Sequence, residues 1–339
     1  MRAFVLTGHG GPEAQEWRTD WPDPVAGPGE VLVRVGACGL NNTDIWTREG
    51  RYAAEPDAAA GWRGAPLAFP RIQGADICGR IVAVGAGVRA ERIGERVLVN
   101  PVVYGPEGDG LDDYDFLGSE RDGGFADLVT IPAVNAVAID TSLADAELAT
   151  FPTAYLTAEH MLARARVGAG ERVLVTGASG GVGSALVQLA ALRGATVIAM
   201  VGPGKAAAAR DLGAACVVPR ESADLAAAIG GPVDVAADVV GGAGFPAVLA
   251  ALRPGGRYVT AGAIAGPHVA LDLRTLYLKR LDLIGSTLGT REEFLAIVGH
   301  IAAGRLRPLL AGSYSLADLP RAQTDFLQKR FFGKLVVVT

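Results

Sequence analysis

The sequence predicts an α/β protein in which a doubly wound parallel sheet is inserted into the chain of a β-rich domain. From Glu171 onward, apolar stretches alternate with helical stretches of about ten residues, as in the βαβ units of a parallel sheet. Before about residue 140 the chain reads as short strands separated by Gly and Pro, and it ends in the strand-like KLVVVT. A parallel sheet between two β-rich segments indicates an inserted domain. We expect that domain at residues 151–293, with 1–150 and 294–339 forming the other domain.

Composition and charge argue against several classes of function. The chain of 339 residues has a net charge of −5 and no basic tract, so nucleic-acid binding has no electrostatic support. Its N-terminus lacks the charged and apolar regions of a secretion signal, and the most apolar stretch, residues 186–201, is too short to cross a bilayer. The three cysteines form no CxxC pair, which favours a reducing compartment. We therefore expect a cytoplasmic protein.

The strongest motif is VLVTGASGGVGSALVQLA, in which an apolar strand runs into a glycine-rich turn and a helix follows. The glycines permit a tight turn and a close approach of the backbone to a pyrophosphate, which the helix N-terminus then binds. A Walker A loop is excluded, because neither Gly-Lys pair of the chain has the required spacing. The motif predicts a Rossmann domain that binds a dinucleotide. The turn residues expected to contact it are Gly177, Ser179, Gly180, Gly181, Val182 and Gly183.

The residues that follow the second strand of this region favour NADPH over NADH. An NAD site usually has an acidic residue at the end of that strand, where it binds the ribose 2′-hydroxyl. Here the strand at residues 196–201 is followed by GPGK, without an acid. Lys205 lies where a cation could meet a 2′-phosphate, and Arg220, just past the third strand, is a second candidate. For both residues the alternative is an ordinary solvated side chain.

Over nearly its whole length the chain resembles the medium-chain dehydrogenase/reductase superfamily, and most of all its zinc-less, quinone oxidoreductase-like members. The matching segments are GLNNTD (39–44), GADICGRIVAVG (74–85), IGERVLV (93–99), GGFADLVTIPA (123–133), FPTAYLTAEHML (151–162) and TGASGGVG. Short-chain dehydrogenases share the glycine motif, but they need it near the N-terminus and a later YxxxK, which neither Tyr258 nor Tyr277 provides. The resemblance implies a GroES-like catalytic domain around the inserted Rossmann domain.

The zinc alcohol dehydrogenases of the superfamily resemble the chain too, so we compared their metal-ligand positions one by one. The ligands of the catalytic zinc fall on Asn41, Ala75 and Ala149, none of which can bind zinc as a thiolate or an imidazole. The lobe that binds a structural zinc would lie near residues 100–120, where there is no cysteine. The resemblance therefore implies a zinc-independent protein without a Lewis acid to assist alcohol oxidation.

Three functions are compatible with these features. Hydride delivery to an activated acceptor needs little help, since the protein must mainly orient the nicotinamide and the acceptor and hydrogen-bond the carbonyl oxygen. The first hypothesis is therefore an NADPH-dependent reductase of a quinone or an α,β-unsaturated carbonyl. The second is a zinc-less ketone or alcohol oxidoreductase on a biosynthetic substrate. The third is a non-catalytic NADPH-binding protein with a structural or sensor role.

The resemblance also implies site residues. Asn41 falls where relatives place a polar side chain at the active site, although an Asn can equally form a turn. Thr43 falls on the hydroxyl of the alcohol dehydrogenase proton relay, and Asp44 is expected to orient the backbone or cofactor rather than to act as a base. The last proton could come from Thr43, Tyr155 or water, and the sequence does not decide. Further cofactor-binding positions are Thr153, which matches a residue beside the nicotinamide, Gly241 and Ala263.

Two long loops at residues 52–70 and 105–124 interrupt the β-rich region, and the Gly- and Asp-rich second loop is expected to be a surface excursion. The aromatic residues Trp46, Tyr52 and Trp62 could line the substrate cleft, but core packing explains them equally well. Some relatives have Tyr in place of Trp46, and an indole cannot supply a proton.

The segment at residues 280–288 predicts a strand at an edge of the parallel sheet. It is apolar at Leu281, Leu283 and Ile284 and contains no proline, so it invites pairing with another strand unless it is covered. Members of the resembling superfamily commonly dimerise through such edges, and we therefore expect a homodimer. The alternative is a strand shielded by the C-terminal segment of its own chain.

Overall fold

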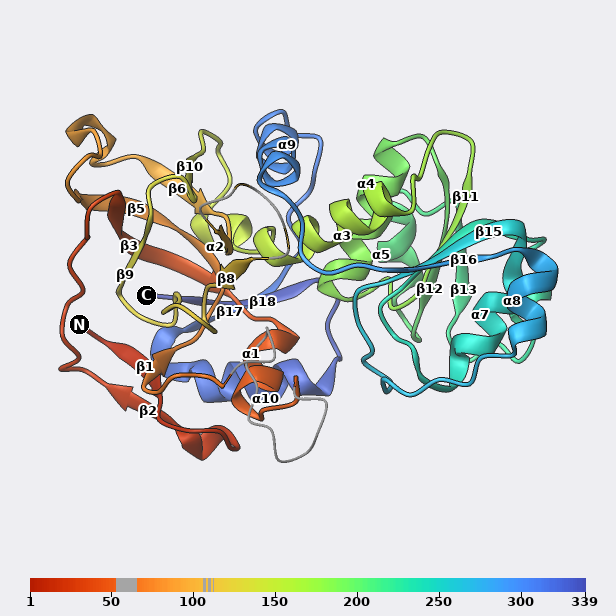
Figure 1. The fold of residues 1–339 in the computed structure, drawn as a ribbon, viewed down its shortest axis with the longest axis horizontal. Coiled ribbons are helices and arrows are strands. Elements are labelled where there is room, and N and C mark those ends of the chain that lie inside the picture. The colour runs from red at the N-terminus through yellow and green to blue at the C-terminus, as the bar shows by residue number, and fades with distance from the viewer. Residues whose placement is uncertain (53–65, 106–107, 109–110, 112) are drawn as a thin grey trace. The chain divides into compact units, whose positions relative to one another are not determined.

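The chain folds into two compact units in the computed structural model (Figure 1). The structure describes residues 1–52, 66–105, 108, 111 and 113–339. One unit, the β-rich unit, contains Met1–Thr153 and Thr290–Thr339, and the other, the Rossmann unit, contains Ala154–Gly289. The predicted architecture, a Rossmann sheet inserted in the chain of a β-rich domain, is confirmed. None of the helices in the described residues is long and apolar enough to cross a membrane.

The Rossmann unit, all of whose residues are described, is built on a six-stranded parallel sheet with the order β13-β12-β11-β14-β15-β16. Its strands are β11 (Arg172–Val175), β12 (Thr196–Val201), β13 (Cys216–Pro219), β14 (Val233–Asp238), β15 (Leu252–Thr260) and β16 (Asp282–Gly285). In chain order this is the 3-2-1-4-5-6 arrangement of dinucleotide-binding sheets. The central strands are runs of Val, Leu, Ile and Ala because a parallel sheet is covered on both faces. The strand predicted at residues 280–288 is β16, and it lies at an edge of the sheet.

One helix precedes the first of these strands and the others connect them. They are α3 (Pro152–Arg164), α4 (Gly181–Leu192), α5 (Ala206–Asp211), α6 (Leu225–Ala228), α7 (Phe245–Ala251) and α8 (Leu273–Lys279). α4 is buried continuously from Gly183 to Ala190, which explains why it is apolar on nearly every side. α8 differs, since Leu273, Tyr277 and Leu278 on it are exposed.

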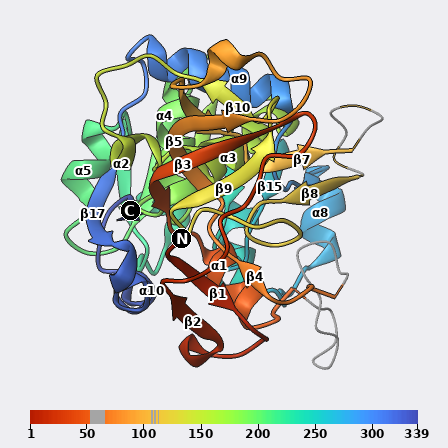
Figure 2. The ribbon, with the colours of Figure 1, turned by 90° about the vertical axis from the view of Figure 1, so that its left-hand side faces the viewer.

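The β-rich unit has a central sheet whose order, among its described residues, is β10-β6-β5-β3-β18-β17, with β9 also paired to β3. Its strands are β3 (Glu30–Gly39), β5 (Asp76–Val84), β6 (Arg96–Val99), β9 (Leu128–Pro132), β10 (Ala136–Ala138), β17 (Leu310–Ser315) and β18 (Lys334–Val338). Figure 2 faces this unit, in which β5, β3 and β9 lie side by side. β18 brings the end of the chain into the sheet, because Val337 pairs with Cys38 of β3.

Smaller elements complete the β-rich unit. A second sheet contains β2 (Gln15–Arg18), β1 (Ala3–Leu6) and β4 (Arg71–Ile72) in that order. The helices among its described residues are α1 (Asn42–Arg48), α2 (Asp145–Leu148), α9 (Arg291–Ala302) and α10 (Leu319–Gln328). The start of α9 is fixed by a capping box, in which the side chains of Thr290 and Glu293 each bind the other's backbone N–H.

The prediction of a surface excursion at residues 105–124 is wrong for its second half. β8 (Tyr114–Phe116) pairs with β7 (Val102–Tyr104), and the segment that follows is largely buried. The N–H groups of Gly123 and Gly124 donate to the carbonyl groups of Ile72 and Gly74. A Cβ atom on Gly123 would lie 2.2 Å from the oxygen of Gly74. The glycines therefore permit close backbone packing here rather than an exposed loop.

Candidate active site

The glycine-rich turn connects β11 to α4 in the Rossmann unit. Gly177 has a φ of 56°, which glycine adopts without strain. A Cβ on Gly183 would lie only 2.1 Å from the oxygen of Gly177, whereas a Cβ on Gly180 would have nothing nearer than 3.5 Å. Gly183 is thus required by the turn itself, while the space beside Gly180 is open. No side chain caps the N-terminus of α4, so its first N–H groups can bind a phosphate.

Two cations lie next to each other beside this turn. The Nζ atom of Lys205 is 3.4 Å from Ser179 Oγ, and a Cβ on Gly202 would be 3.4 Å from Cζ of Arg220. Burial, and then the positive charge of Arg220, lower the pKa of Lys205. Arg220 is 67% exposed and also pairs with Glu221. An anion bound at this point would relieve the repulsion between the two cations, so the structure brings Ser179, Lys205 and Arg220 together in an arrangement that fits a phosphate.

Asp238 at the end of β14 is a site-forming residue that sequence reasoning missed. Its buried carboxylate accepts hydrogen bonds from the hydroxyls of Thr176 and Tyr258 and from the backbone N–H of Gly241. It therefore fixes the carboxyl ends of three neighbouring strands, where dinucleotides bind to such sheets. A Cβ on Gly241 would lie 3.6 Å from Cα of Ala263, so these two predicted cofactor-binding residues lie together. The signal in the sequence that could have identified this residue was an acid at the end of the apolar strand VDVAAD.

In the β-rich unit, Asn41 and Asp44 form the start of α1. The backbone N–H of Asn41 donates to Asp44 Oδ2 at 2.7 Å, and Gln73 Nε2 donates to the backbone oxygen of Asp44 at 2.9 Å. The carboxyl group of Asp44 is buried, and this burial, before any other cause, raises its pKa to about 7. Asp44 thus contacts the backbone of Asn41, while its expected role in orienting the backbone or the cofactor stays a prediction.

Asn41 lies at the partly buried end of a polar network that reaches Thr153. Lys334 Nζ donates to Asn41 Oδ1 at 2.8 Å and forms an ion pair with Asp76 Oδ2. The other oxygen of Asp76 accepts the backbone N–H of Thr153 at 2.8 Å. The side chains of Lys334 and Asp76 are 5% and 0% exposed. The structure thus connects Asn41 and Thr153 through Lys334 and Asp76, which sequence reasoning missed. The available signal was a single charged residue at the start of an apolar strand in each case.

Two predicted hydroxyl groups lie in the same unit. Thr43 Oγ1 and Thr153 Oγ1 are buried, and neither has a hydrogen-bond partner in the part of the chain that the structure describes. A buried hydroxyl without a partner is rare, and it retains its capacity to bind a ligand. Trp46 and Tyr52 also lie together, with ring centroids 5.8 Å apart. Trp62 is outside the described residues.

Comparison with known proteins agrees with this geometry. The family model for the alcohol dehydrogenase GroES-like domain matches residues 27–141, and that for zinc-binding dehydrogenases matches residues 181–303. The quinone oxidoreductase of Mus musculus is 30% identical over 343 residues, which are 96% of this chain and 94% of the mouse protein. The acryloyl-coenzyme A reductase of Metallosphaera sedula is 29% identical over the full length of both chains. A solved structure from Sinorhizobium meliloti 1021, provisionally named an alcohol dehydrogenase, is 55% identical, with a TM-score of 0.97 over 100% of this chain and 96% of that one.

The chain belongs to the medium-chain dehydrogenase/reductase superfamily. The predicted family is therefore confirmed, and the protein is an oxidoreductase of this superfamily.

The positions of the superfamily's catalytic-zinc ligands lie close together in this structure. A Cβ on Gly39 would meet the backbone oxygen of Ala149 at 2.3 Å and Asp76 Cβ at 3.1 Å, so the segments that carry these positions converge. The side chains at the three ligand positions are the amide of Asn41 and the methyl groups of Ala75 and Ala149. Among the described residues, no group of three or more His, Cys, Asp or Glu side chains could hold a metal ion.

Tyr155, one of the proton donors that the sequence left open, lies within the Rossmann unit. Its side chain is 1% exposed, and its hydroxyl accepts a hydrogen bond from Gln188 Nε2 at 2.6 Å. Burial raises the pKa of Tyr155. Thr43 Oγ1 is buried as well, so Thr43, Tyr155 and water all remain candidates for the proton donor.

The raised pKa of Asp44 predicts a particular pH dependence of stability. Because the folded protein binds this proton more tightly than the unfolded chain, the contribution of Asp44 to stability is present at low pH. It is lost as the pH rises from about 4 to about 7. The difference in unfolding free energy between Asp44→Asn and the wild type should therefore shift in favour of the variant by about 2–4 kcal/mol over this range. Denaturant unfolding of both proteins at several pH values measures it.

Asp272 provides a matched control for this measurement. It also begins a helix, α8, but it is exposed, and a hydrogen bond from Arg274 lowers its pKa. Asp272→Asn should therefore produce a smaller shift of opposite sign. Parallel pH profiles for Asp44→Asn and the wild type would contradict the assignment.

Proposed function

We propose that the protein is an NADPH-dependent reductase that delivers hydride to a quinone or an α,β-unsaturated carbonyl without a metal. The observation that carries the proposal is the network at Asn41. An amide held by Lys334 stands at a position where zinc-dependent members of the superfamily have a metal ligand. An amide N–H can stabilise negative charge that develops on a carbonyl oxygen, and a water-excluding site strengthens that interaction. Relatives named acryloyl-coenzyme A reductase and quinone oxidoreductase support this class of acceptor.

NADPH fits the residues of the Rossmann unit. The pyrophosphate would lie against the open backbone at Gly180, and the 2′-phosphate would be held by Ser179, Lys205 and Arg220. When bound, this cofactor supplies the hydride. The protein contributes orientation of the acceptor, exclusion of water and hydrogen bonds to the acceptor oxygen, for which Asn41 and Thr43 are the candidates. The free cysteines support action in a reducing compartment, the cytoplasm.

A second function, a zinc-less ketone or alcohol oxidoreductase, is favoured by one observation. The Sinorhizobium meliloti structure at 55% identity carries the name of an alcohol dehydrogenase. The non-catalytic alternative predicts stoichiometric NADPH binding without turnover of any carbonyl compound. The three functions therefore differ in measurable reactions.

The experiment is a panel of quinones, enones, ketones and secondary alcohols, assayed with both nicotinamide cofactors after elemental analysis of the same preparation. We expect NADPH oxidation with enones or quinones, no oxidation of secondary alcohols, and far less than one zinc per chain. Alcohol oxidation without zinc would favour the second function. One zinc per chain, lost together with activity on chelation, would refute the metal-free mechanism.

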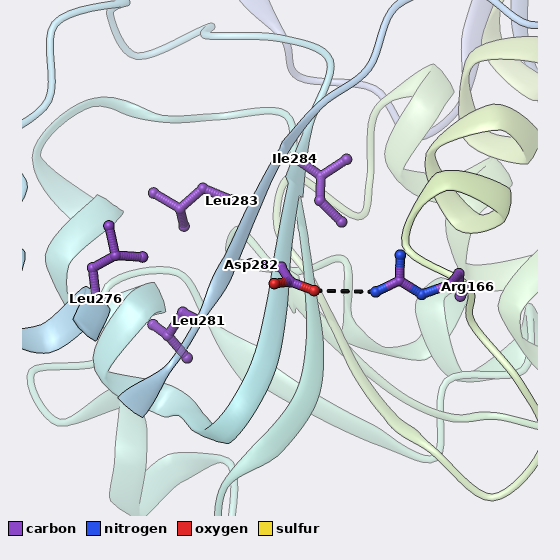
Figure 3. Close-up of a pocket in the computed structure, with 6 residues that line it drawn as sticks. All are labelled: Arg166, Leu276, Leu281, Asp282, Leu283 and Ile284. Atoms are coloured by element: carbon purple, nitrogen blue, oxygen red, sulfur yellow. Dashed lines mark hydrogen bonds and ion pairs between the residues drawn. The ribbon is translucent and has the colours of Figure 1, made fainter. Parts of the chain in front are cut away.

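We also infer a homodimer that forms partly along β16 of the Rossmann unit. Figure 3 shows this edge, where Leu281, Leu283 and Ile284 line a shallow pocket beside the Arg166–Asp282 ion pair. Leu283 is 39% exposed, and it belongs to a strand that has one unpaired edge. Such an apolar edge favours pairing with a second copy.

Light scattering at micromolar concentration should accordingly give a mass near twice 34.8 kDa. A charge at an edge strand opposes pairing, so Leu283→Lys should shift the mass toward that of one chain. Leu295→Lys is the control, because this leucine is also exposed but lies on α9 of the other unit. A wild-type mass near that of one chain would reject the dimer.

A further inference from the structure

The partly buried contact between Lys334 and Asn41 indicates a role that the proposed function does not yet assign. We propose that Lys334 is a positioning residue, which fixes the orientation of the Asn41 amide so that its NH₂ group faces the reacting carbonyl. This inference rests on the proposed function, since it requires a carbonyl acceptor.

The chemistry of the two side chains determines which way the amide is turned. A lysine ammonium has three donors and no acceptor, so Asn41 must direct its oxygen toward Lys334 Nζ, 2.8 Å away. Its NH₂ group therefore faces away from the ion pair. The contact of Nδ2 with the oxygen of Gly39 is 3.5 Å long, at the limit for a hydrogen bond, so the amide keeps capacity to donate to a ligand.

The backbone of Asn41 is fixed as well as its side chain. Its N–H donates to Asp44 Oδ2, so the residue is bound at one end to α1 and at the other to Lys334 at the start of β18. Preorganised donors of this kind need no rearrangement when charge develops on the acceptor. The structure therefore supplies both requirements of an electrophilic amide, a defined orientation and a fixed position.

Asp76 explains how an ammonium group can be held here. It pairs with Lys334 through one oxygen and accepts the N–H of Thr153 through the other, so both oxygens of this buried carboxylate are bound. A buried ion pair is seldom retained for stability alone, because removing two charges from water costs about as much as their attraction returns. At low dielectric the ammonium also polarises the amide to which it donates, and this strengthens the N–H groups of Asn41 as donors.

A second lysine–asparagine pair on the neighbouring residue provides a matched control. Lys329 Nζ donates to Asn42 Oδ1 at 3.0 Å, but this contact is exposed and does not include Asp76. Both pairs join a lysine ammonium to an asparagine oxygen, and they differ in burial, in the contact of Lys329 with the ring of Phe326 and in their connection to the candidate site. A general effect of losing a lysine–asparagine contact would appear in both.

The experiment measures kcat and KM for enone or quinone reduction with saturating NADPH, together with the Kd for NADPH. Asn41→Ala should lower kcat about 100-fold, as for loss of one oxyanion-stabilising donor. Lys334→Gln should lower kcat at least about tenfold with KM and the NADPH Kd nearly unchanged, because glutamine can present either end of its amide to Asn41. Lys334→Arg retains only donors and should recover most of the lost rate. Lys329→Gln should behave as the wild type.

A double variant tests whether Lys334 acts through Asn41. Adding Lys334→Gln to Asn41→Ala should lower kcat no further, whereas independent roles would multiply the two effects. If Lys334→Gln fails to fold because Asp76 is left without its partner, the same comparison is made with Lys334→Gln and Asp76→Asn combined. Wild-type kcat in the Lys334 variants, or multiplied effects in the double variant, would overturn this role alone. A wild-type protein that reduces no carbonyl acceptor would overturn the proposed function and this role with it.

Discussion

Replacing Gly180 by valine should abolish cofactor binding while the chain still folds. The space beside Gly180 is open, since a Cβ there has no atom nearer than Gly177 O at 3.5 Å, so the fold can accept a side chain. The same space is where a pyrophosphate would approach the backbone at the start of α4. We expect the Kd for NADPH to rise on the order of 100-fold or more in a fluorescence titration. The circular dichroism spectrum and the thermal midpoint should remain close to those of the wild type.

Gly183 provides the contrasting variant within the same turn. A Cβ on Gly183 would lie 2.1 Å from Gly177 O, so Gly183→Ala should destabilise the protein whether or not cofactor is present. Undiminished NADPH binding by Gly180→Val would show that the turn has only a structural role. A loss of folded protein in both variants would equally reject the distinction between the two glycines.

Replacing Lys205 by alanine should weaken NADPH binding about 10- to 150-fold and leave NADH binding nearly unchanged. A hydrogen bond to a charged group contributes about 1.5–3 kcal/mol, and each 1.4 kcal/mol is about a factor of ten in Kd. NADH lacks the 2′-phosphate that Lys205 would contact. Parallel titrations of the variant with both cofactors measure the difference.

Two further variants test whether this effect is specific. Arg220→Ala should weaken NADPH binding less, because Arg220 is 67% exposed and already paired with Glu221. Arg210 is an exposed cation near the end of α5, and Arg210→Ala should have no effect on either cofactor. Equal affinity of the wild type for NADPH and NADH would refute the proposed preference.

The Rossmann sheet could be predicted closely from sequence, because its buried strands are continuous apolar runs that end at turn residues. TVIAMV, for example, corresponds residue for residue to β12. Residues 114–124 could not be predicted in this way. Glycine permits both an exposed turn and close backbone packing, and only the position of Gly74 opposite Gly123 distinguishes them.

The candidate site could be predicted only in part for a similar reason. The resemblance identified Asn41, Asp44 and Thr153, whose roles remain predictions. It did not identify Asp76 and Lys334, which are 258 residues apart and meet only because β18 joins the same sheet as β5. Local patterns in a sequence contain no information on pairs of that separation.

The position of β18 has a consequence for the order in which the chain can fold during synthesis. β3 emerges from the ribosome early and its partners β5 and β9 follow soon, but its third partner, β18, follows by about 300 residues, or roughly 15–60 s at 5–20 residues per second. Until then residues 37–39 of β3 are unpaired at the edge that β18 will occupy, and Asp76 is buried without its cation or remains in water. The Rossmann unit is synthesised completely within this interval and can fold first. Chaperones that cover exposed strand edges should therefore bind nascent chains that end between residues 153 and 334 more strongly than the finished protein, and a ribosome-bound series of truncated chains would reveal that window.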